Sequence, residues 1–275
     1  IARHFGLEAE QVAIGNGADD LIEMCFRAFA GAGDRVAYST PTYPLFEPLC
    51  TIHDAVPSPN PSGEMFTWST ELMDDPAPLK FLVNPNSPTG TWHGRASVER
   101  ALLRSKGLVV LDEAYVDFAF ESQVPLLAKH DNLLILRTMS KSYALAGMRI
   151  GFALGSPQLI ADLDAVKDSY NVDRLAIVAA AAAIEDEEHH RRIVDHVVSE
   201  RRWLELQLQE VGFEHSPSEA NFVFVKPAVA NSGAAVADAL RKRRILIRHY
   251  DRDPIAGWFR ITVGTRSQHL SLIHI

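Results

Sequence analysis

Short continuous apolar runs alternate with longer amphipathic stretches through the first two thirds of the chain. Continuous runs of Val, Ile and Leu are typical of strands that are buried on both faces. The expected strands are Arg35–Tyr38, Leu79–Val83, Leu108–Leu111, Leu133–Leu136 and Arg149–Leu154. Helical patterns lie between them at Asp19–Ala30, Leu45–Cys50, Ala96–Ser105 and Pro157–Asp168. This alternation predicts an α/β fold, a three-layer sandwich whose mostly parallel sheet is covered by helices on both faces.

The pattern changes near residue 186. A long amphipathic helix is expected from about Glu187 to Val211. After it we expect strand Asn221–Val225, helix Gly233–Arg244, and strands Ile245–Arg248 and Trp258–Val263. We therefore predict a large domain of residues 1–185 and a smaller, incomplete C-terminal α+β domain of residues 186–275.

Two short segments are treated separately. The stretch Pro57–Ser62 is rich in Pro, Ser and Asn, and we interpret it as a surface loop. The last five residues, 271–275, do not continue the preceding periodicity. We exclude them from the expected fold as a non-native end.

Composition narrows the class of protein. The chain has 275 residues, of which 47% are hydrophobic and 23% charged, an ordinary globular balance. Its net charge of −8 argues against nucleic acid or anionic lipid as a partner. The longest apolar run, Leu175 to Ile184, is about half of what a bilayer span needs, so no membrane segment is expected. Cys25 and Cys50 lie in apolar stretches and fit reduced thiols of a cytoplasmic protein. No spacing of metal ligands is present, and no metal site is predicted.

A lysine follows directly on one buried strand. Lys141 has hydroxyl neighbours, Thr138 and Ser140, and is followed by small residues and Arg149. Such a lysine can form an imine with an aldehyde cofactor, while the neighbouring groups bind a phosphate. The alternative is a surface lysine in a loop, which the length of the pattern disfavours.

An aspartate ends a neighbouring strand in the segment Leu111-Asp112-Glu113-Ala114-Tyr115. A cofactor with a pyridine ring needs a carboxylate at its ring nitrogen, and Asp112 is placed for this role. Tyr115 is near enough in sequence to reach a ring hydroxyl. The alternative is that Asp112 only caps the following turn, and the residues alone leave both interpretations open.

Three further motifs follow strand ends, where ligands of parallel sheets bind. The rigid loop Asn84–Gly90 could hold an amide against a ligand, or be a plain turn. The segment Gly15–Asp20 opens a helix whose backbone N–H groups could bind an anion, unless Asp19 is only an N-cap. In Pro41–Pro44, Tyr43 offers an aromatic face for stacking, although a lone tyrosine is more often part of the core.

Together these blocks resemble fold-type I aminotransferases, and in detail the histidinol-phosphate aminotransferase family. Two late blocks, Leu246-Ile247-Arg248 and Arg260-Ile261-Thr262-Val263-Gly264-Thr265, also match its pattern. The match runs in order from Gly15 to Thr265, which is nearly the whole chain. The complete series of blocks is much more specific than any one of them.

The resemblance implies pyridoxal 5′-phosphate as the cofactor, held by Lys141 as a Schiff base, with Lys141 also shuttling the proton. It implies Asp112 at the pyridine nitrogen, Tyr115 at the ring hydroxyl and Tyr43 stacked on the ring. The phosphate would be held by the amides of Ala18 and Asp19, the hydroxyls of Thr138 and Ser140, and Arg149. Substrate binding would fall to Arg260, assisted by Arg248, with Asn221 nearby.

The implied reaction moves an amino group from histidinol phosphate to 2-oxoglutarate in histidine biosynthesis. The implied partners are therefore a small-molecule amino donor and a 2-oxo acid acceptor, bound by a homodimer. Three alternatives stay open: an aromatic amino-acid aminotransferase, a phosphothreonine decarboxylase, and the ligand-sensing domain of a regulator. The complete late arginine block favours a working enzyme.

The chain departs from the family pattern in two ways. Ser87 stands where the family usually has the Asn that contacts the ring hydroxyl. Ser87 itself, Asn86 or a water could take over that contact. In addition, family members begin some tens of residues upstream of Ile1, so we expect this chain to be a fragment without the N-terminal segment.

Overall fold

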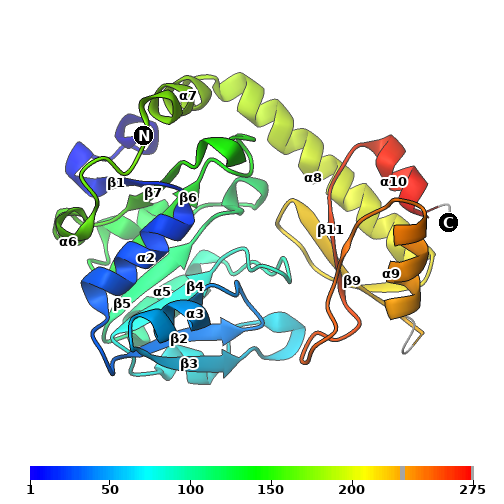
Figure 1. Ribbon diagram of the computed structural model, residues 1–275, viewed down its shortest axis with the longest axis horizontal. Coiled ribbons are helices and arrows are strands. Elements are labelled where there is room, and N and C mark those ends of the chain that lie inside the picture. The colour runs from blue at the N-terminus through cyan, green and yellow to red at the C-terminus, as the bar shows by residue number, and fades with distance from the viewer. Residues whose placement is uncertain (230–232, 274–275) are drawn as a thin grey trace.

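The computed structural model describes residues 1–229 and 233–273. Two sheets organise these residues, one of seven strands and one of four. Figure 1 shows the larger sheet in the blue-to-green part of the chain and the smaller sheet in the yellow-to-red part. A long helix, α8 (Glu187–Glu210), passes from one part to the other. The predicted boundary at residue 185 falls just before this helix, and the two-domain division stays a prediction.

The seven-stranded sheet has the order β1-β7-β6-β5-β4-β2-β3. Its strands are β1 (Val12–Gly15), β2 (Arg35–Thr40), β3 (Val56–Pro61), β4 (Leu79–Val83), β5 (Leu108–Asp112), β6 (Leu133–Thr138) and β7 (Gly151–Leu154). Five strands that are neighbours in the sheet, β6, β5, β4, β2 and β3, pair in parallel. Strand β7 runs antiparallel to both β6 and β1. The predicted mostly parallel sheet is confirmed.

Helices cover both faces of this sheet, and its three central strands are buried along their whole length. Alternate residues of β5 enter opposite cores, Val110 on one face and Val109 and Leu111 on the other. The first core also takes side chains from α2 (Ala18–Phe29), α3 (Phe46–Ile52) and α6 (Pro157–Val166). The second takes side chains from α4 (Thr70–Asp74), α5 (Arg95–Arg104) and α7 (Arg174–Glu185), and α1 (Ala2–Phe5) packs beside it.

One predicted loop is a strand. The stretch Pro57–Ser62 forms most of β3, at the edge of the sheet. Its prolines alternate with residues that face β2, and backbone N–H groups on either side complete the ladder: Val56 donates to Asp34 at 2.8 Å and Ser62 to Thr40 at 2.8 Å. The proline nitrogens, which carry no N–H, face the open side of the strand, where there is no neighbouring strand to bond to. An edge strand therefore tolerates these prolines.

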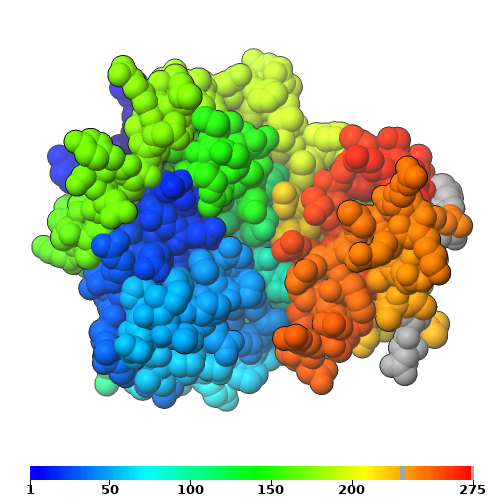
Figure 2. All heavy atoms as spheres, viewed as in Figure 1, coloured from blue at the N-terminus to red at the C-terminus, as the bar shows by residue number. Residues whose placement is uncertain are grey.

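The second lobe contains an antiparallel sheet of order β10-β11-β9-β8. Its elements are β8 (Phe213–Ser216), β9 (Phe222–Pro227), α9 (Gly233–Lys242), β10 (Arg248–His249), β11 (Phe259–Thr262) and α10 (Arg266–Ile273). Leu204 and Leu208 of α8 pack with Val223, Val225 and Phe259 to form its core. Figure 2 shows this lobe, in orange and red, beside the blue-to-green one.

Two predictions for this lobe are wrong. The expected strand Ile245–Arg248 pairs only from Arg248 onward, because Arg244 adopts a positive φ of 63° and Ile245 donates to the Leu240 carbonyl at 3.0 Å. These contacts terminate α9 instead of starting a strand. The exclusion of residues 271–273 from the fold is also wrong, because α10 continues to Ile273 and packs it on the core, whereas the non-native origin of the last five residues stays a prediction. Residues 274–275 lie outside the described part.

Within residues 1–229 and 233–273, none of the helices combines the length and the apolar character that crossing a membrane requires.

Candidate active site

The carboxyl ends of the parallel strands meet at one edge of the large sheet. Asp112 at the end of β5 pairs with Val83 of β4 on one side and with Leu136 of β6 on the other. Gly15 of β1 and Thr138 of β6 both pair with Gly151 of β7. The register therefore brings the loops that follow β1, β4, β5 and β6 to one place.

A cavity of about 150 Å³ lies between these loops. Most of the residues that the sequence singled out for a cofactor line it: Ala18, Asp19, Tyr43, Ser87, Asp112, Tyr115, Thr138, Ser140, Lys141 and Arg149. Ile22, Val83, Ala114 and Ala146 add apolar walls that sequence reasoning missed. Their positions in the sequence could have identified two of them: Val83 is the last residue of a predicted strand, and Ile22 lies one helical turn after Ala18.

Lys141 lies in the loop that follows β6. Its ammonium is 5.2 Å from the centre of the Tyr115 ring. The loop turns sharply at Ala144, whose φ is 55°, and returns to the sheet as Met139 donates to the Ile150 carbonyl at 3.0 Å. Tyr115 and Lys141 therefore share one end of the cavity, although they follow different strands.

Asp112 is buried, with only 5% of its surface exposed. Burial raises its pKa to about 6, partly offset by a hydrogen bond from the Ala114 amide to Oδ1 at 2.9 Å. That bond is the turn cap that the sequence left open as an alternative. In the described part of the chain Oδ2 has no protein donor, so Asp112 caps the turn and still has an oxygen for a ligand. A buried carboxylate of this kind favours a cationic partner, whose charge would lower its pKa again.

A second group of residues in the cavity lining suits an anion. Helix α2 starts after Gly17, whose φ is 86°, and no side chain caps it, so Asp19 is not an N-cap. The Arg149 guanidinium lies against this helix end, where a Cβ on Gly17 would be 2.5 Å from Arg149 Nη2. The Thr138 hydroxyl donates to Ser140 Oγ at 2.9 Å beside it. Free helix N–H groups, a guanidinium and two hydroxyls fit a phosphate group.

Asp19 and Tyr43 lie beside these residues. The Tyr43 hydroxyl donates to Asp19 Oδ1 at 3.0 Å, and Arg149 lies 3.4 Å from Asp19 Oδ2. Burial and the Asp19 carboxylate raise the pKa of Tyr43 above its usual value. The tyrosine therefore stays neutral, with its ring against the cavity.

The loop after β4 separates the roles of Asn86 and Ser87. The Asn86 amide is used within the protein: it accepts from Thr42 Oγ1 at 2.7 Å and donates to the Pro41 carbonyl at 3.0 Å. It does not line the cavity. Ser87 does, and its hydroxyl accepts from Arg260 Nη1 at 3.1 Å. Of the two side chains that could replace the usual Asn, Ser87 and Asn86, the geometry favours Ser87.

Only one of the three predicted substrate residues reaches this site. Arg260 of β11 approaches through its contact with Ser87, and its guanidinium carbon lies 5.2 Å from the Phe222 ring centre. Arg248 is its cross-strand neighbour but is exposed and lines a separate cavity of about 530 Å³. Asn221 is placed by its backbone, whose carbonyl accepts from Val263 at 2.9 Å, and it does not line the cofactor cavity.

The residues present fit pyridoxal 5′-phosphate. The cavity lining combines groups that suit an anion, a carboxylate with a raised pKa, Asp112, and a lysine, Lys141. An aromatic ring, Tyr43, and apolar walls suit a planar ring. This constellation defines a pyridoxal-phosphate-dependent aminotransferase of the α/β type.

Comparison with known proteins supports the assignment to this class of enzyme. Residues 1–274 match the family model "Aminotransferase class I and II". Histidinol-phosphate aminotransferase 1 of Bradyrhizobium diazoefficiens is 41% identical over 279 residues, covering 100% of this chain and 79% of that protein. The histidinol-phosphate aminotransferase of Synechocystis is 38% identical over 261 residues, covering 95% of this chain and 74% of that protein.

A solved structure is similar over the same extent. Histidinol-phosphate aminotransferase from Sinorhizobium meliloti, in complex with pyridoxal-5′-phosphate, has a TM-score of 0.91 and 28% identity, and the match covers 99% of this chain and 77% of that one. The chain belongs to the class I and II aminotransferases, and within them to the histidinol-phosphate aminotransferase family.

Proposed function

We propose that this protein transfers the amino group of histidinol phosphate to 2-oxoglutarate, a step of histidine biosynthesis. The observation that carries the proposal is the cavity in which Lys141, Asp112 and an anion site converge, with Arg260 reaching in from the second lobe. The relatives named above support the choice of donor.

When bound, pyridoxal 5′-phosphate supplies an electron-withdrawing ring that stabilises negative charge at the substrate's α carbon. Lys141 holds the cofactor, and its Nζ removes the proton from that carbon and later returns it. Asp112 keeps the ring nitrogen protonated through its free oxygen. Tyr115 and Ser87 would bind the ring hydroxyl, and the contacts of Asn86 with Thr42 and Pro41 would help to fix the loop that carries Ser87.

The remaining lining residues orient the cofactor. Tyr43 stacks on the ring. The phosphate is held by the amides of Ala18 and Asp19, the hydroxyls of Thr138 and Ser140, and the Arg149 guanidinium. These groups come from two connections, the one after β1 and the one between β6 and β7, so together they would fix the position of the phosphate and with it the orientation of the cofactor.

Arg260 and Arg248 would share the anionic groups of the substrates. Arg260 lies next to the cavity and is placed for a carboxylate or a phosphate, while Arg248 is one strand further out. We expect Arg248→Gln to lower kcat/KM for histidinol phosphate about 10-fold or more, the equivalent of losing one charge-assisted contact. Glutamate should lose less, because it can still use Arg260. Asn221, beside the same strands, would assist.

The measurement is kcat/KM for both donors in the wild type and in Arg248→Gln. Lys226→Gln, a change at the end of β9 away from both cavities, serves as the control for loss of positive charge. Equal losses for both donors in Arg248→Gln would contradict the assignment. A wild-type preference for phenylalanine over histidinol phosphate would favour an aromatic amino-acid aminotransferase, and carbon dioxide release from phosphothreonine would indicate the decarboxylase.

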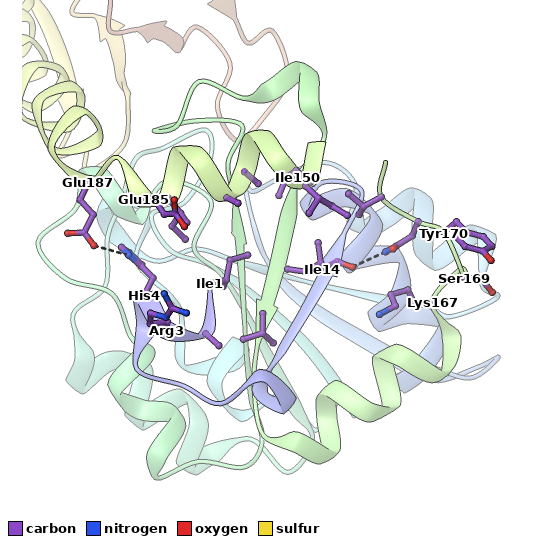
Figure 3. Close-up of a pocket in the computed structure, with 18 residues that line it drawn as sticks. Ile1, Arg3, His4, Ile14, Ile150, Lys167, Ser169, Tyr170, Glu185 and Glu187 are labelled. Carbon is purple, nitrogen blue, oxygen red and sulfur yellow. Dashed lines mark hydrogen bonds and ion pairs between the residues drawn. The ribbon is translucent and has the colours of Figure 1, made fainter. Parts of the chain in front are cut away.

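We propose a homodimer that forms through α7. Three large apolar side chains of this helix are exposed: Leu175 by 76%, Ile177 by 52% and Val178 by 61%. A cavity of about 1170 Å³ lies alongside it, bordered by Ile14, Tyr170 and other residues shown in Figure 3. So much apolar surface on one helix is typical of a contact with another protein.

The charges at the ends of α7 favour a second copy as the occupant. Arg174 stands at the N-terminus and Glu185 at the C-terminus, the reverse of what the helix dipole favours. In the described residues neither has an ion-pair partner. When two copies of α7 pack antiparallel, Arg174 of one meets Glu185 of the other, and Val178 meets Ala181. The surface is then complementary to itself, as a two-fold dimer requires.

We expect Val178→Glu to convert the dimer to a monomer at micromolar concentration, as measured by light scattering after gel filtration. The physical reason is that a two-fold contact buries two unpaired carboxylates for each substitution. Leu206→Glu on α8 is the matched control, because Leu206 is similarly exposed, by 60%, but lies on another helix. A Val178→Glu dimer would show that the interface lies elsewhere, and a wild-type monomer would contradict the homodimer itself.

We also propose a cytoplasmic location. Cys25 and Cys50 are both free and buried, which suits a reducing compartment.

A further inference from the structure

A buried ionic network lies beside the cofactor cavity and has no part in the chemistry proposed above. The Arg137 side chain is 6% exposed and lies 3.2 Å from Glu113, which is fully buried. Arg137 also pairs with Asp117, which is 15% exposed, and the Glu113 carboxylate accepts from the Gln123 backbone N–H at 2.7 Å. One guanidinium thus lies between two carboxylates away from water.

The protonation states show how strongly these groups interact. Burial raises the pKa of Glu113, against the opposing attraction of Arg137. Burial acts in the same direction on Asp117, but the Arg137 guanidinium, the nearby His190 and a hydrogen bond from Ser142 outweigh it and hold the pKa of Asp117 well below its usual range. Burying three charges is costly, and apolar side chains of similar volume often stabilise a protein as well. Stability alone therefore does not account for the network.

The positions of these residues in the chain indicate what the network does. Glu113 and Asp117 follow Asp112 in the loop after β5, whereas Arg137 belongs to β6 and Ser142 directly follows Lys141. The Ser142 hydroxyl donates to Asp117. The loop that carries the buried carboxylate is thus tied to the loop that carries the lysine.

The next residue of the lysine loop is held as well. The Tyr143 ring stacks on His190 of α8, with ring centres 4.0 Å apart and planes inclined by 13°. His190 Nε2 lies 3.8 Å from Asp117 Oδ2. Asp117 therefore meets groups from β6, the lysine loop and α8. Immediately afterwards the chain turns at Ala144, where φ is 55°.

We propose that Asp117 and Ser142 are positioning residues that hold Lys141 at its working distance from Asp112, with Arg137 and Glu113 fixing Asp117 in place. Neither residue lines the cofactor cavity, so both act through the backbone of the lysine loop. The inference rests on the proposed role of Lys141. It adds that the geometry of the reacting lysine is set by the neighbouring strand-end loop.

Ser142→Ala is the sharpest test, because it removes the tie between the loops and leaves both ion pairs of Arg137 in place. We expect kcat for the half-reaction with the amine donor to fall about 10- to 100-fold, the range that a small misplacement of a reacting group produces. The KM for the donor should stay near the wild-type value. The pH midpoint of the absorbance change of the bound cofactor should shift, and hydrogen exchange of residues 139–149 in the cofactor-free protein should become faster.

Ser105→Ala is the matched control. The Ser105 hydroxyl likewise bonds to a charged group, although as an acceptor from Lys80 Nζ at 2.9 Å, and Ser105 does not line the cavity. The Ser105→Ala variant should leave kcat, the absorbance midpoint and the hydrogen exchange of residues 139–149 unchanged. Ser142→Thr keeps the hydroxyl and should restore most of the activity that Ser142→Ala loses.

Several results would overturn the inference. One is a Ser142→Ala protein with wild-type kcat, absorbance midpoint and exchange of the lysine loop. Another is an equal loss in Ser105→Ala, which would show that a lost buried hydroxyl acts only through general stability. Failure of the proposed function is distinguishable, since borohydride reduction would then label a lysine other than Lys141 whatever residue stands at position 142.

Discussion

Lys141→Ala should reduce transamination by about 10⁴-fold or more, because the change removes both the group that holds the cofactor covalently and the base at the substrate's α carbon. Phosphate binding should survive, since Arg149 and the start of α2 are unchanged. We therefore expect the variant to retain bound cofactor with an altered absorbance spectrum while its half-reaction rate collapses.

Borohydride reduction followed by peptide mapping locates the attachment directly. The label is expected on Lys141, the lysine that lines the cavity. The control variants are Lys106→Ala and Lys167→Ala, and both should leave labelling and activity unchanged. Lys167 lines the larger cavity beside α7. A label on either of these two lysines would contradict the assignment of Lys141 as the cofactor-binding lysine.

Asp112→Asn should keep the cofactor bound and lower kcat by about 10²-fold, roughly 3 kcal/mol of transition-state stabilisation. Asparagine preserves the shape of the side chain and can still accept from the Ala114 amide at Oδ1, so the turn remains. What is lost is the negative charge that keeps the ring nitrogen protonated. Asp34→Asn is the control, because Asp34 accepts the Gly31 amide in a similar turn, at 2.8 Å, away from the cavity.

The pH dependence of the unfolding free energy of the cofactor-free protein tests the environment of Asp112 without measuring turnover. Burial raises the folded-state pKa of Asp112 from 3.8 to about 6, so the folded state binds the proton more tightly than the unfolded chain. Its stabilising contribution is complete below about pH 4 and is lost as the pH rises through 6. Relative to Asp112→Asn, the wild type should lose up to about 3 kcal/mol of unfolding free energy over that interval.

Urea unfolding at a series of pH values measures this difference. A pH-independent difference between the wild type and Asp112→Asn would mean that Asp112 is solvated in the folded state. A near-wild-type half-reaction rate in Asp112→Asn would show that the residue only caps its turn.

The sequence alone was sufficient for the central sheet and for the residues at its carboxyl edge. Strands β4, β5 and β6 are continuous apolar runs, and a parallel sheet brings the loops after them together whatever its detailed register. Lys141 and Asp112 were therefore predictable as neighbours, and both line the cavity. Local pattern and strand order carried that information.

Sequence reasoning was weaker where pairing depends on a distant segment. Strand β3 has the prolines of a loop, and it forms because its pairing N–H groups happen to face β2. The apolar stretch after α9 looks like a strand, but a left-handed turn at Arg244 ends the helix and delays pairing to Arg248. Neither outcome can be inferred from propensity, because the partner strand decides it.

Side-chain direction was likewise decided only by the tertiary structure. Asn86 and Ser87 are adjacent in one loop, and contacts with Thr42 and the Pro41 carbonyl turn the amide away and leave the hydroxyl in the cavity. Arg248 and Arg260 look equivalent in the sequence, but only Arg260 touches a lining residue. Residue types specify which chemistry is available, whereas the packing of loops from distant strands determines which groups meet, because a hydrogen bond depends on distances of a few tenths of an ångström.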